Sequence, residues 1–198
     1  MKPQRPIHRR APVTPVAQLP ADLPPLLRRI FARRNVSGAA ELDYALTNLL
    51  PYTQLAQVEK AAQMLADAIA ADQHIVIIAD YDADGATACA VAMRGLRACG
   101  AQHVSYLVPD RMRDGYGLQP PLADLAAQAG AHLLVTVDNG ISAIEGVARA
   151  RALGMGVLVT DHHLAGAQLP DADVIVNPNQ PGDEFPSKSV AGVGVMFY

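Results

Sequence analysis

An apolar run is followed directly by acids in Ile75-Val76-Ile77-Ile78-Ala79-Asp80-Tyr81-Asp82-Ala83-Asp84-Gly85-Ala86-Thr87, or IVIIADYDADGAT. Its first five residues are apolar without alternation, which is typical of a strand that is buried on both faces of a sheet. Three carboxylates follow at alternate positions, and at this spacing they repel one another. The pattern suits a calcium loop, a phosphate-accepting aspartate or a site for catalytic divalent metals, so the rest of the sequence has to decide between them.

Strand-like and helix-like segments alternate along the chain that follows. Apolar, β-rich runs are found at residues 74–80, 103–110, 132–138, 154–161 and 171–178. Helices are predicted between them at residues 85–100, 119–130 and 141–154, each ending at a glycine. This alternation predicts an α/β fold with a mainly parallel β-sheet and helices on both faces.

The composition is that of a folded domain, with 51% hydrophobic and 18% charged residues in a chain of 198. No apolar run approaches the ~20 residues that span a bilayer, and the N-terminus lacks a signal-peptide core, so we expect a cytoplasmic protein. Residues 1–34 carry eight Lys and Arg residues against Asp22 alone, a local charge of +7 that leaves −10 for the remainder. This basic arm fits either nucleic-acid contact or a solvated tail.

Three regions are expected along the chain. Residues 1–20 are predicted to be a flexible basic leader, and residues 21–73 a helical segment with helices near 23–34, 41–52 and 54–73. The α/β domain is assigned to residues 74–198. Since the chain stops inside an apparent helix start, VAGVGVMFY, we expect it to be a piece of a longer protein.

Acidic and histidine clusters follow three of the predicted strands. Asp138 comes after the third strand, and Asp161, His162 and His163 come after the fourth. Because the carboxyl ends of parallel strands lie at one edge of a sheet, these clusters should meet the DYDADG acids there. One aspartate alone would be an ordinary turn residue, but three acidic clusters with two histidines indicate bound divalent cations, with Mn²⁺ or Mg²⁺ favoured over structural zinc.

The rival explanations of DYDADG fit less well. A calcium loop needs a glutamate at its twelfth position, where this chain has Val91, and a helix rather than a strand before it. Phosphotransferases of the haloacid dehalogenase type need Thr or Val at the fifth position of their first motif, and neither reading frame supplies it. A non-catalytic nucleic-acid binder would use the basic arm but would leave the acidic clusters unexplained.

Five segments in order resemble the successive motifs of the DHH phosphoesterase superfamily, and within it the bacterial exonucleases specific for single-stranded DNA. They are DYDADG (80–85), RMRDGYGL (111–118), VTVDNGIS (135–142), VTDHH (159–163) and VNPNQPGDEFPSKSVAGVGVMFY (176–198). The resemblance covers nearly the whole chain. It implies a metal-dependent phosphodiesterase that degrades single-stranded DNA from the 5′ end to mononucleotides in DNA recombination and repair, using two Mn²⁺ or Mg²⁺ ions.

The resemblance also implies roles for the residues of the metal site. Asp82 and Asp84 are expected to bind different metals, Asp138 to bridge them, and His162 to be a further ligand. For Asp80 three roles are open: it binds a metal directly, it holds a metal ligand in place, or it belongs to the water network of the site.

Other residues are expected to act on the substrate or to brace the site. His163 is a candidate for contact with the scissile phosphate or the leaving oxygen, and Asp161 for orienting His162 or bracing the loop. Candidate substrate contacts in the neighbouring motifs are Arg111, Asp114, Tyr116 and Gly85, the last through the free N–H groups of a helix N-terminus. A rigid Gly-Tyr-Gly turn is an equal explanation of RMRDGYGL.

The same resemblance sets the expected partners and the alternative function. Single-stranded DNA is the expected substrate, a single-strand-binding protein or a helicase are candidate protein partners, and no membrane is expected. A DHH-type nano-RNase or cyclic-dinucleotide phosphodiesterase is the alternative, but such enzymes usually carry a histidine where this chain has Ile78. A further metal-binding aspartate and a clamp domain are expected after Tyr198, so the 198-residue piece alone should be nearly inactive.

Overall fold

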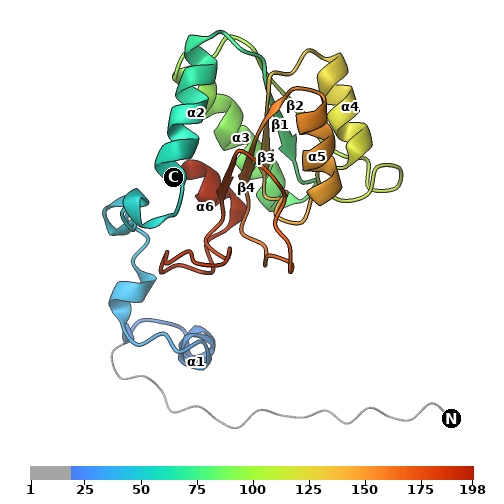
Figure 1. The fold of residues 1–198 in the computed structure, drawn as a ribbon. Coiled ribbons are helices and arrows are strands. Elements are labelled where there is room, and N and C mark those ends of the chain that lie inside the picture. The colour runs from blue at the N-terminus through green and yellow to red at the C-terminus, as the bar shows by residue number, and fades with distance from the viewer. Residues whose placement is uncertain (1–18) are drawn as a thin grey trace, which may run out of the picture. The chain divides into compact units, whose positions relative to one another are not determined.

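The computed structural model describes residues 19–198, and its centre is a sheet of five parallel strands (Figure 1). Their order across the sheet is β2-β1-β3-β4-β5. The strands are β1 (Ile75–Ala79), β2 (Val104–Leu107), β3 (Leu133–Val137), β4 (Gly156–Thr160) and β5 (Val174–Val176). The predicted α/β class and the parallel sheet are confirmed.

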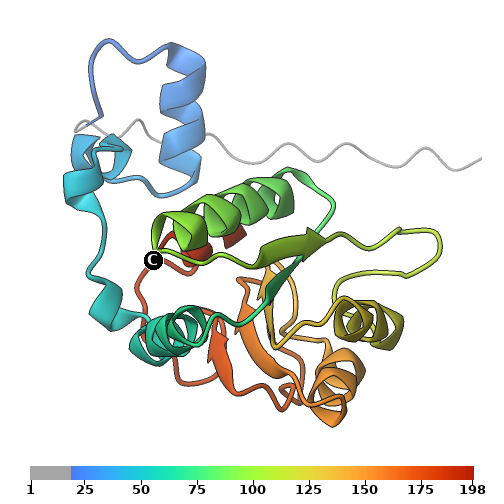
Figure 2. The same cartoon turned by 90° about the horizontal axis from the view of Figure 1, so that it is seen from above.

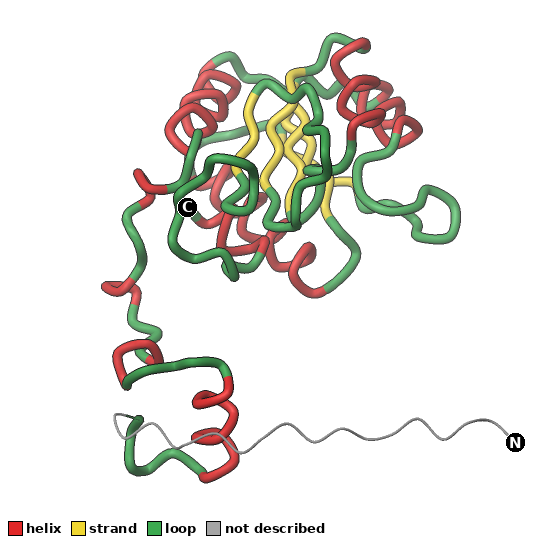
Figure 3. Tube along the Cα trace, turned by 60° about the horizontal axis from the view of Figure 1, so that its bottom comes forward, coloured by secondary structure: helices red, strands yellow, loops and turns green. Residues whose placement is uncertain are grey.

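Helices cover both faces of the sheet, as Figures 2 and 3 show. Val76 and Ile78 of β1 point into a core built with α4 (Pro120–Gln128) and α5 (Ile144–Ala152). Side chains alternate along a strand, so Ile75 and Ile77 face the opposite side. That side is covered by α2 (Val58–Ala70), α3 (Ala83–Ala98) and α6 (Gly192–Phe197). Burial on both faces explains why the central strands are continuously apolar.

The start of α3 differs from the prediction and matters for the site. The helix was expected to open at Gly85, but it begins at Ala83. Asp82 caps it, because its Oδ1 accepts the backbone N–H groups of Asp84 and Gly85. A Cβ at Gly85 would lie 2.5 Å from the carbonyl oxygen of Asp80, so glycine lets α3 approach the end of β1.

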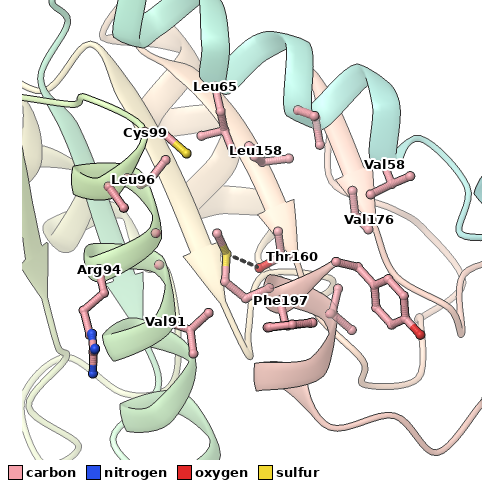
Figure 4. Close-up of a pocket in the computed structure, with 18 of the residues that line it drawn as sticks. Val58, Leu65, Val91, Arg94, Leu96, Cys99, Leu158, Thr160, Val176 and Phe197 are labelled. Atoms are coloured by element: carbon pink, nitrogen blue, oxygen red, sulfur yellow. Dashed lines mark hydrogen bonds between the residues drawn. The ribbon is translucent and has the colours of Figure 1, made fainter. Parts of the chain in front are cut away.

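An apolar pocket of about 660 Å³ lies on the face covered by α2, α3 and α6 (Figure 4). Leu158, Thr160 and Val176 form its floor on β4 and β5. The hydroxyl of Thr160 donates to the carbonyl of Thr136 at 2.7 Å and lies 3.9 Å from Met196 Sδ. The first contact joins β4 to β3, and the second attaches α6 to β4 close to the carboxyl edge of the sheet.

The chain divides into two compact units, the first ending at Leu50 and the second spanning Pro51–Tyr198. In the first unit, α1 (Pro25–Arg33) confirms the predicted helix. The helix predicted at 41–52 is wrong, because the chain makes short 3-10 turns at Ala39–Leu42 and Leu46–Asn48 instead. Asp43 accepts the N–H of Ala45 through its side chain, a local turn that competes with a helix.

The predicted leader, residues 1–20, lies outside the described residues except for its last two. Within residues 19–198, no helix combines the length and apolar character needed to cross a membrane.

Candidate metal centre

The carboxyl edge of the sheet brings the predicted clusters together. The last paired residues of β1, β3 and β4 lie side by side, and each is followed by an aspartate, namely Asp80, Asp138 and Asp161. The next strand in the chain, β2, pairs with one side of β1, and β3 pairs with the other side of β1. This switch in strand order is where open α/β sheets bind their ligands.

Two groups of ligand-type side chains meet at Asp138. Ligand atoms of Asp138, His162 and His163 lie within 4.8 Å of one another, and so do those of Asp80, Asp82 and Asp138. Asp138 is therefore shared by both groups. The convergence expected from strand topology is present in the structure.

Asp138 is held in a position that is unfavourable for a lone carboxylate. It is 1% exposed, has a φ of 62°, and its Oδ1 accepts no hydrogen bond. Burial, and next the charge of Asp84, raise the pKa of Asp138 to about 7. A backbone in the left-handed region and an unbonded buried oxygen both cost free energy, which is characteristic of functional sites.

His162 presents a bare nitrogen to the carboxylates. Its Nδ1 lies 2.9 Å from the carbonyl oxygen of Val190 and donates to it, so Nε2 of the neutral ring carries no proton. That Nε2 lies 3.0 Å from Asp138 Oδ1 and 3.5 Å from Asp84 Oδ2. In the neutral ring these donors converge on one point, a geometry that a shared cation satisfies.

The spacing and chemistry of these donors fit a divalent ion. Neighbouring ligands of an octahedral ion lie about 3.0 Å apart when each is about 2.1 Å from the ion, which matches the separation of His162 and Asp138. Carboxylate oxygens with one imidazole nitrogen suit Mn²⁺ or Mg²⁺. The Val190 carbonyl acts as the outer partner that fixes the histidine tautomer.

The three acids of DYDADG have different surroundings. Asp80 is 5% exposed, accepts the N–H of Tyr81 at 2.7 Å, and has its pKa raised mainly by burial. Asp82 uses Oδ1 as the cap of α3. Asp84 accepts the N–H groups of Gly192 and Val193, each at 2.8 Å, and so joins the start of α3 to the start of α6.

Asp161 and His163 form a second pair within the DHH motif. Asp161 Oδ1 accepts from the ring Nδ1 of His163 at 2.7 Å, and its Oδ2 accepts the N–H of Ile141 at 2.9 Å. Burial alone would raise the pKa of Asp161, but the hydrogen bonds from His163 and Ile141 hold it below its usual value. The same bond to Asp161 raises the pKa of His163 to about 8. The ring that Asp161 orients is therefore that of His163, and its bond to Ile141 braces the loop.

The RMRDGYGL motif lies partly against the site. Tyr116 donates its hydroxyl to the carbonyl of Asp138 at 3.2 Å, and its ring meets the rings of Tyr81 and His163 edge-on, at 6.3 and 6.1 Å between centroids. The guanidinium of Arg111 lies 5.3 Å from the centre of the Tyr81 ring. Asp114 instead pairs with Arg113 and accepts the N–H of Asp110, so it braces the turn.

Residues 74–198 match the N-terminal domain of the DHH family. The chain belongs to the DHH family. Across its full length it is 52% identical to the single-stranded-DNA-specific exonuclease RecJ of Salmonella typhimurium, of which it covers 34%. The chain thus spans about a third of the length of such relatives.

Solved structures give the same family. A structure of exonuclease RecJ bound to manganese superposes with a TM-score of 0.66 at 34% identity, covering 75% of this chain and 36% of that one. The structure of RecJ from Thermus thermophilus in complex with Mn²⁺ gives a TM-score of 0.65 at 30% identity, covering 84% of this chain and 23% of that one.

Sequence reasoning missed three asparagines that hold this DHH-family site in place. The fully buried Asn139 donates to the carbonyls of Ile78 and Val137, both at 2.9 Å, and so ties the ends of β1 and β3. Asn177 donates to the carbonyl of His163 at 3.0 Å, and Asn179 to that of His162 at 2.6 Å. The signals in the sequence were Asn139 in VTVDNGIS and the pair of asparagines in VNPNQ, which read equally well as turns.

Proposed function

We propose that this chain is the metal-binding part of an exonuclease that hydrolyses single-stranded DNA from the 5′ end to mononucleotides, in DNA recombination and repair. The observation that carries the proposal is the bare Nε2 of His162 facing the buried, unbonded Oδ1 of Asp138, 3.0 Å away. The similarity to RecJ exonucleases over the whole chain supports the substrate.

The proposed cofactors are two divalent cations, Mn²⁺ or Mg²⁺. Asp138 belongs to both ligand groups, which suits a bridging carboxylate. Asp82 with Asp80 would complete one side, and His162 with Asp84 the other. Bound divalent cations would supply an activated water and positive charge at the phosphate oxygens.

His163 is proposed to act on the leaving group. Its Nδ1 is bonded to Asp161, which leaves Nε2 as the nitrogen that can contact a substrate. With a pKa of about 8, the ring carries a proton on Nε2 at neutral pH. In hydrolysis the water oxygen bonds to phosphorus and gives up a proton to the solvent, the bond between phosphorus and O3′ breaks, and O3′ takes the proton from His163. The product is a nucleotide with a 5′ phosphate.

We assign residues 74–198 to the DHH domain, 21–73 to a helical segment and 1–20 to a basic leader. Arg111 and Tyr116 are kept as candidate substrate-positioning residues, whereas the N–H of Gly85 is bonded to Asp82 and Asp114 is paired with Arg113. A cytoplasmic location and a single-strand-binding protein or helicase as partner follow from DNA repair as the proposed role.

The test is digestion of 5′-phosphorylated single-stranded DNA of tens of nucleotides in Mn²⁺, using the protein that contains this chain. The proposal expects mononucleotides released in order from the 5′ end, and no product from Asp138→Ala with a native circular dichroism spectrum. Cleavage confined to dinucleotides or cyclic dinucleotides would instead favour the alternative branch of the family.

A further inference from the structure

A second pocket opens directly beside the acidic cluster, between α3 and the edge strand β2. Its volume is about 490 Å³, within the ~300–1,000 Å³ typical of pockets that bind small molecules. Asp80 and Tyr81 line its end nearest the metal centre. Its other walls come from α3 and from β2 with the residues after it, and the side chains that matter below are Met93, Arg94, Arg97, Tyr106 and Val108.

The Lys and Arg side chains of the second unit, Pro51–Tyr198, fall into two groups, with and without a carboxylate partner. Within the described residues, the Lys and Arg side chains of Pro51–Tyr198 that pair with a carboxylate are Arg113, Arg149, Arg151 and Lys188. Those without a carboxylate partner are Lys60, Arg94, Arg97 and Arg111.

Three of these four arginine and lysine side chains gather at the second pocket. Arg94 and Arg97 line it, and Arg111 lies over Tyr81 at its end. In Figure 4 the guanidinium of Arg94 extends from α3 away from α6. Arg94 and Arg97 come 10 and 13 residues after Asp84 on α3, which is about 15 and 20 Å along the helix. Their positive charge without a carboxylate partner therefore suits the phosphates of a strand that runs away from the acids.

The pocket also offers an exposed aromatic surface. Tyr106 is 57% exposed and Val108 is 43% exposed, although both are large apolar side chains. Tyr106 lies on β2, which pairs only with β1 and forms the edge of the sheet. An aromatic ring with neighbouring arginines is the combination that binds an unstacked base and its phosphate.

We propose that this pocket is a subsite for a nucleotide of single-stranded DNA, with the base against Tyr106 and its phosphates at Arg94 and Arg97. The inference rests on the proposed function and deepens it. A base paired in a duplex is stacked and cannot lie flat on the tyrosine, so the subsite selects single strands.

The experiment measures binding of a 5′-phosphorylated oligo-dT of about 20 nucleotides by fluorescence anisotropy. The protein that contains this chain is used, with Ca²⁺ to limit hydrolysis. The Arg94→Ala/Arg97→Ala variant removes two phosphate contacts, so the slope of log affinity against log salt should fall by about 1.4, at ~0.7 for each phosphate of a single strand. Tyr106→Ala should weaken binding by about 5- to 150-fold, the range for loss of one stacked base.

Lys60→Ala is the matched control. It removes a cation that also lacks a carboxylate partner among the described residues, but Lys60 lines a different pocket, beside Asp173 on the far edge of the sheet. It should change neither the affinity nor the salt slope. If an alanine variant loses its folded spectrum, Arg94→Gln/Arg97→Gln and Tyr106→Leu keep the bulk of each side chain and should give the same losses.

The outcomes separate the two proposals. If the wild-type protein binds and digests single-stranded DNA but the pocket variants match it in slope and affinity, the subsite is refuted and the exonuclease stands. If the wild-type protein neither binds nor digests single-stranded DNA, the proposed function itself fails. A loss in the pocket variants with an unchanged Lys60→Ala protein supports the subsite.

Discussion

Replacing Asp161 with asparagine should lower the pKa of His163, and its amide NH2 would also replace the oxygen that accepts the N–H of Ile141. The hydrogen bond from Nδ1 to the Asp161 carboxylate is the main reason why the pKa of His163 is raised from 6.5 to about 8. In Asp161→Asn the pKa should return toward its ordinary value. At pH 7.5, a pKa of about 8 leaves about three-quarters of the rings protonated, and a pKa of 6.5 about one-tenth, so the protonated form falls about 8-fold.

The assay is a pH titration of the His163 ring signals by NMR in the metal-free chain, followed by the pH dependence of DNA digestion. Asp161→Asn should move the fall in kcat on the alkaline side to lower pH, because the proton for the leaving oxygen is lost earlier. Asp124→Asn, which changes a carboxylate bonded to Arg149 on α5 instead, is the control and should change neither the pKa of His163 nor the pH dependence of digestion. An unchanged His163 pKa in Asp161→Asn would refute the pairing.

Three further predictions address the carboxylate cluster and its supports. Burial and the charge of Asp84 raise the pKa of Asp138 to about 7, so in metal-free protein the ionised carboxylate is destabilising, and stability should fall as pH rises from about 4 to 7. Asp138→Asn should remove that fall in urea unfolding, and Mn²⁺ should stabilise only the wild type. Asn179→Ala should reduce Mn²⁺ affinity about 10-fold, because its bond to the backbone carbonyl of His162 holds the loop that carries this ligand. The neighbouring Gln180→Ala, which loses one bond to the Ile175 carbonyl, should leave the Mn²⁺ affinity unchanged. Gly192→Ala should destabilise by about 1–3 kcal/mol because its Cβ would overlap Asp138 Oδ1, whereas Gly95→Ala, in open space on α3, should stabilise by about 0.5–1 kcal/mol.

Much of the sheet and the meeting of its acidic clusters could be predicted from the sequence. The runs IVIIA and LLVTV are apolar at every position except one threonine, and only strands covered on both faces need that pattern. Once the strands are parallel, the residues after them must share an edge. Asp80, Asp138 and Asp161 could therefore be placed together without knowing any distance.

The contacts within the loops could not be predicted in the same way. Asp161 bonds to the ring of His163, two residues on, and this depends on backbone angles that a tripeptide sequence does not fix. Asp84 meets Gly192 across 108 positions, because α6 returns to the site only after the sheet is complete. Local rules also misplaced the helix at 41–52, where side-chain turns outcompete helical hydrogen bonds.

The central claim is that the carboxylates around Asp138 are tolerated because they bind a pair of divalent cations. Anomalous scattering from crystals of the protein soaked in Mn²⁺ tests it most directly. Binding of two ions predicts two peaks within about 4 Å of each other, with Asp138 between them and His162 Nε2 bonded to one. Crystals with full manganese occupancy elsewhere and no peak beside Asp138, or one peak that does not touch His162, would contradict it.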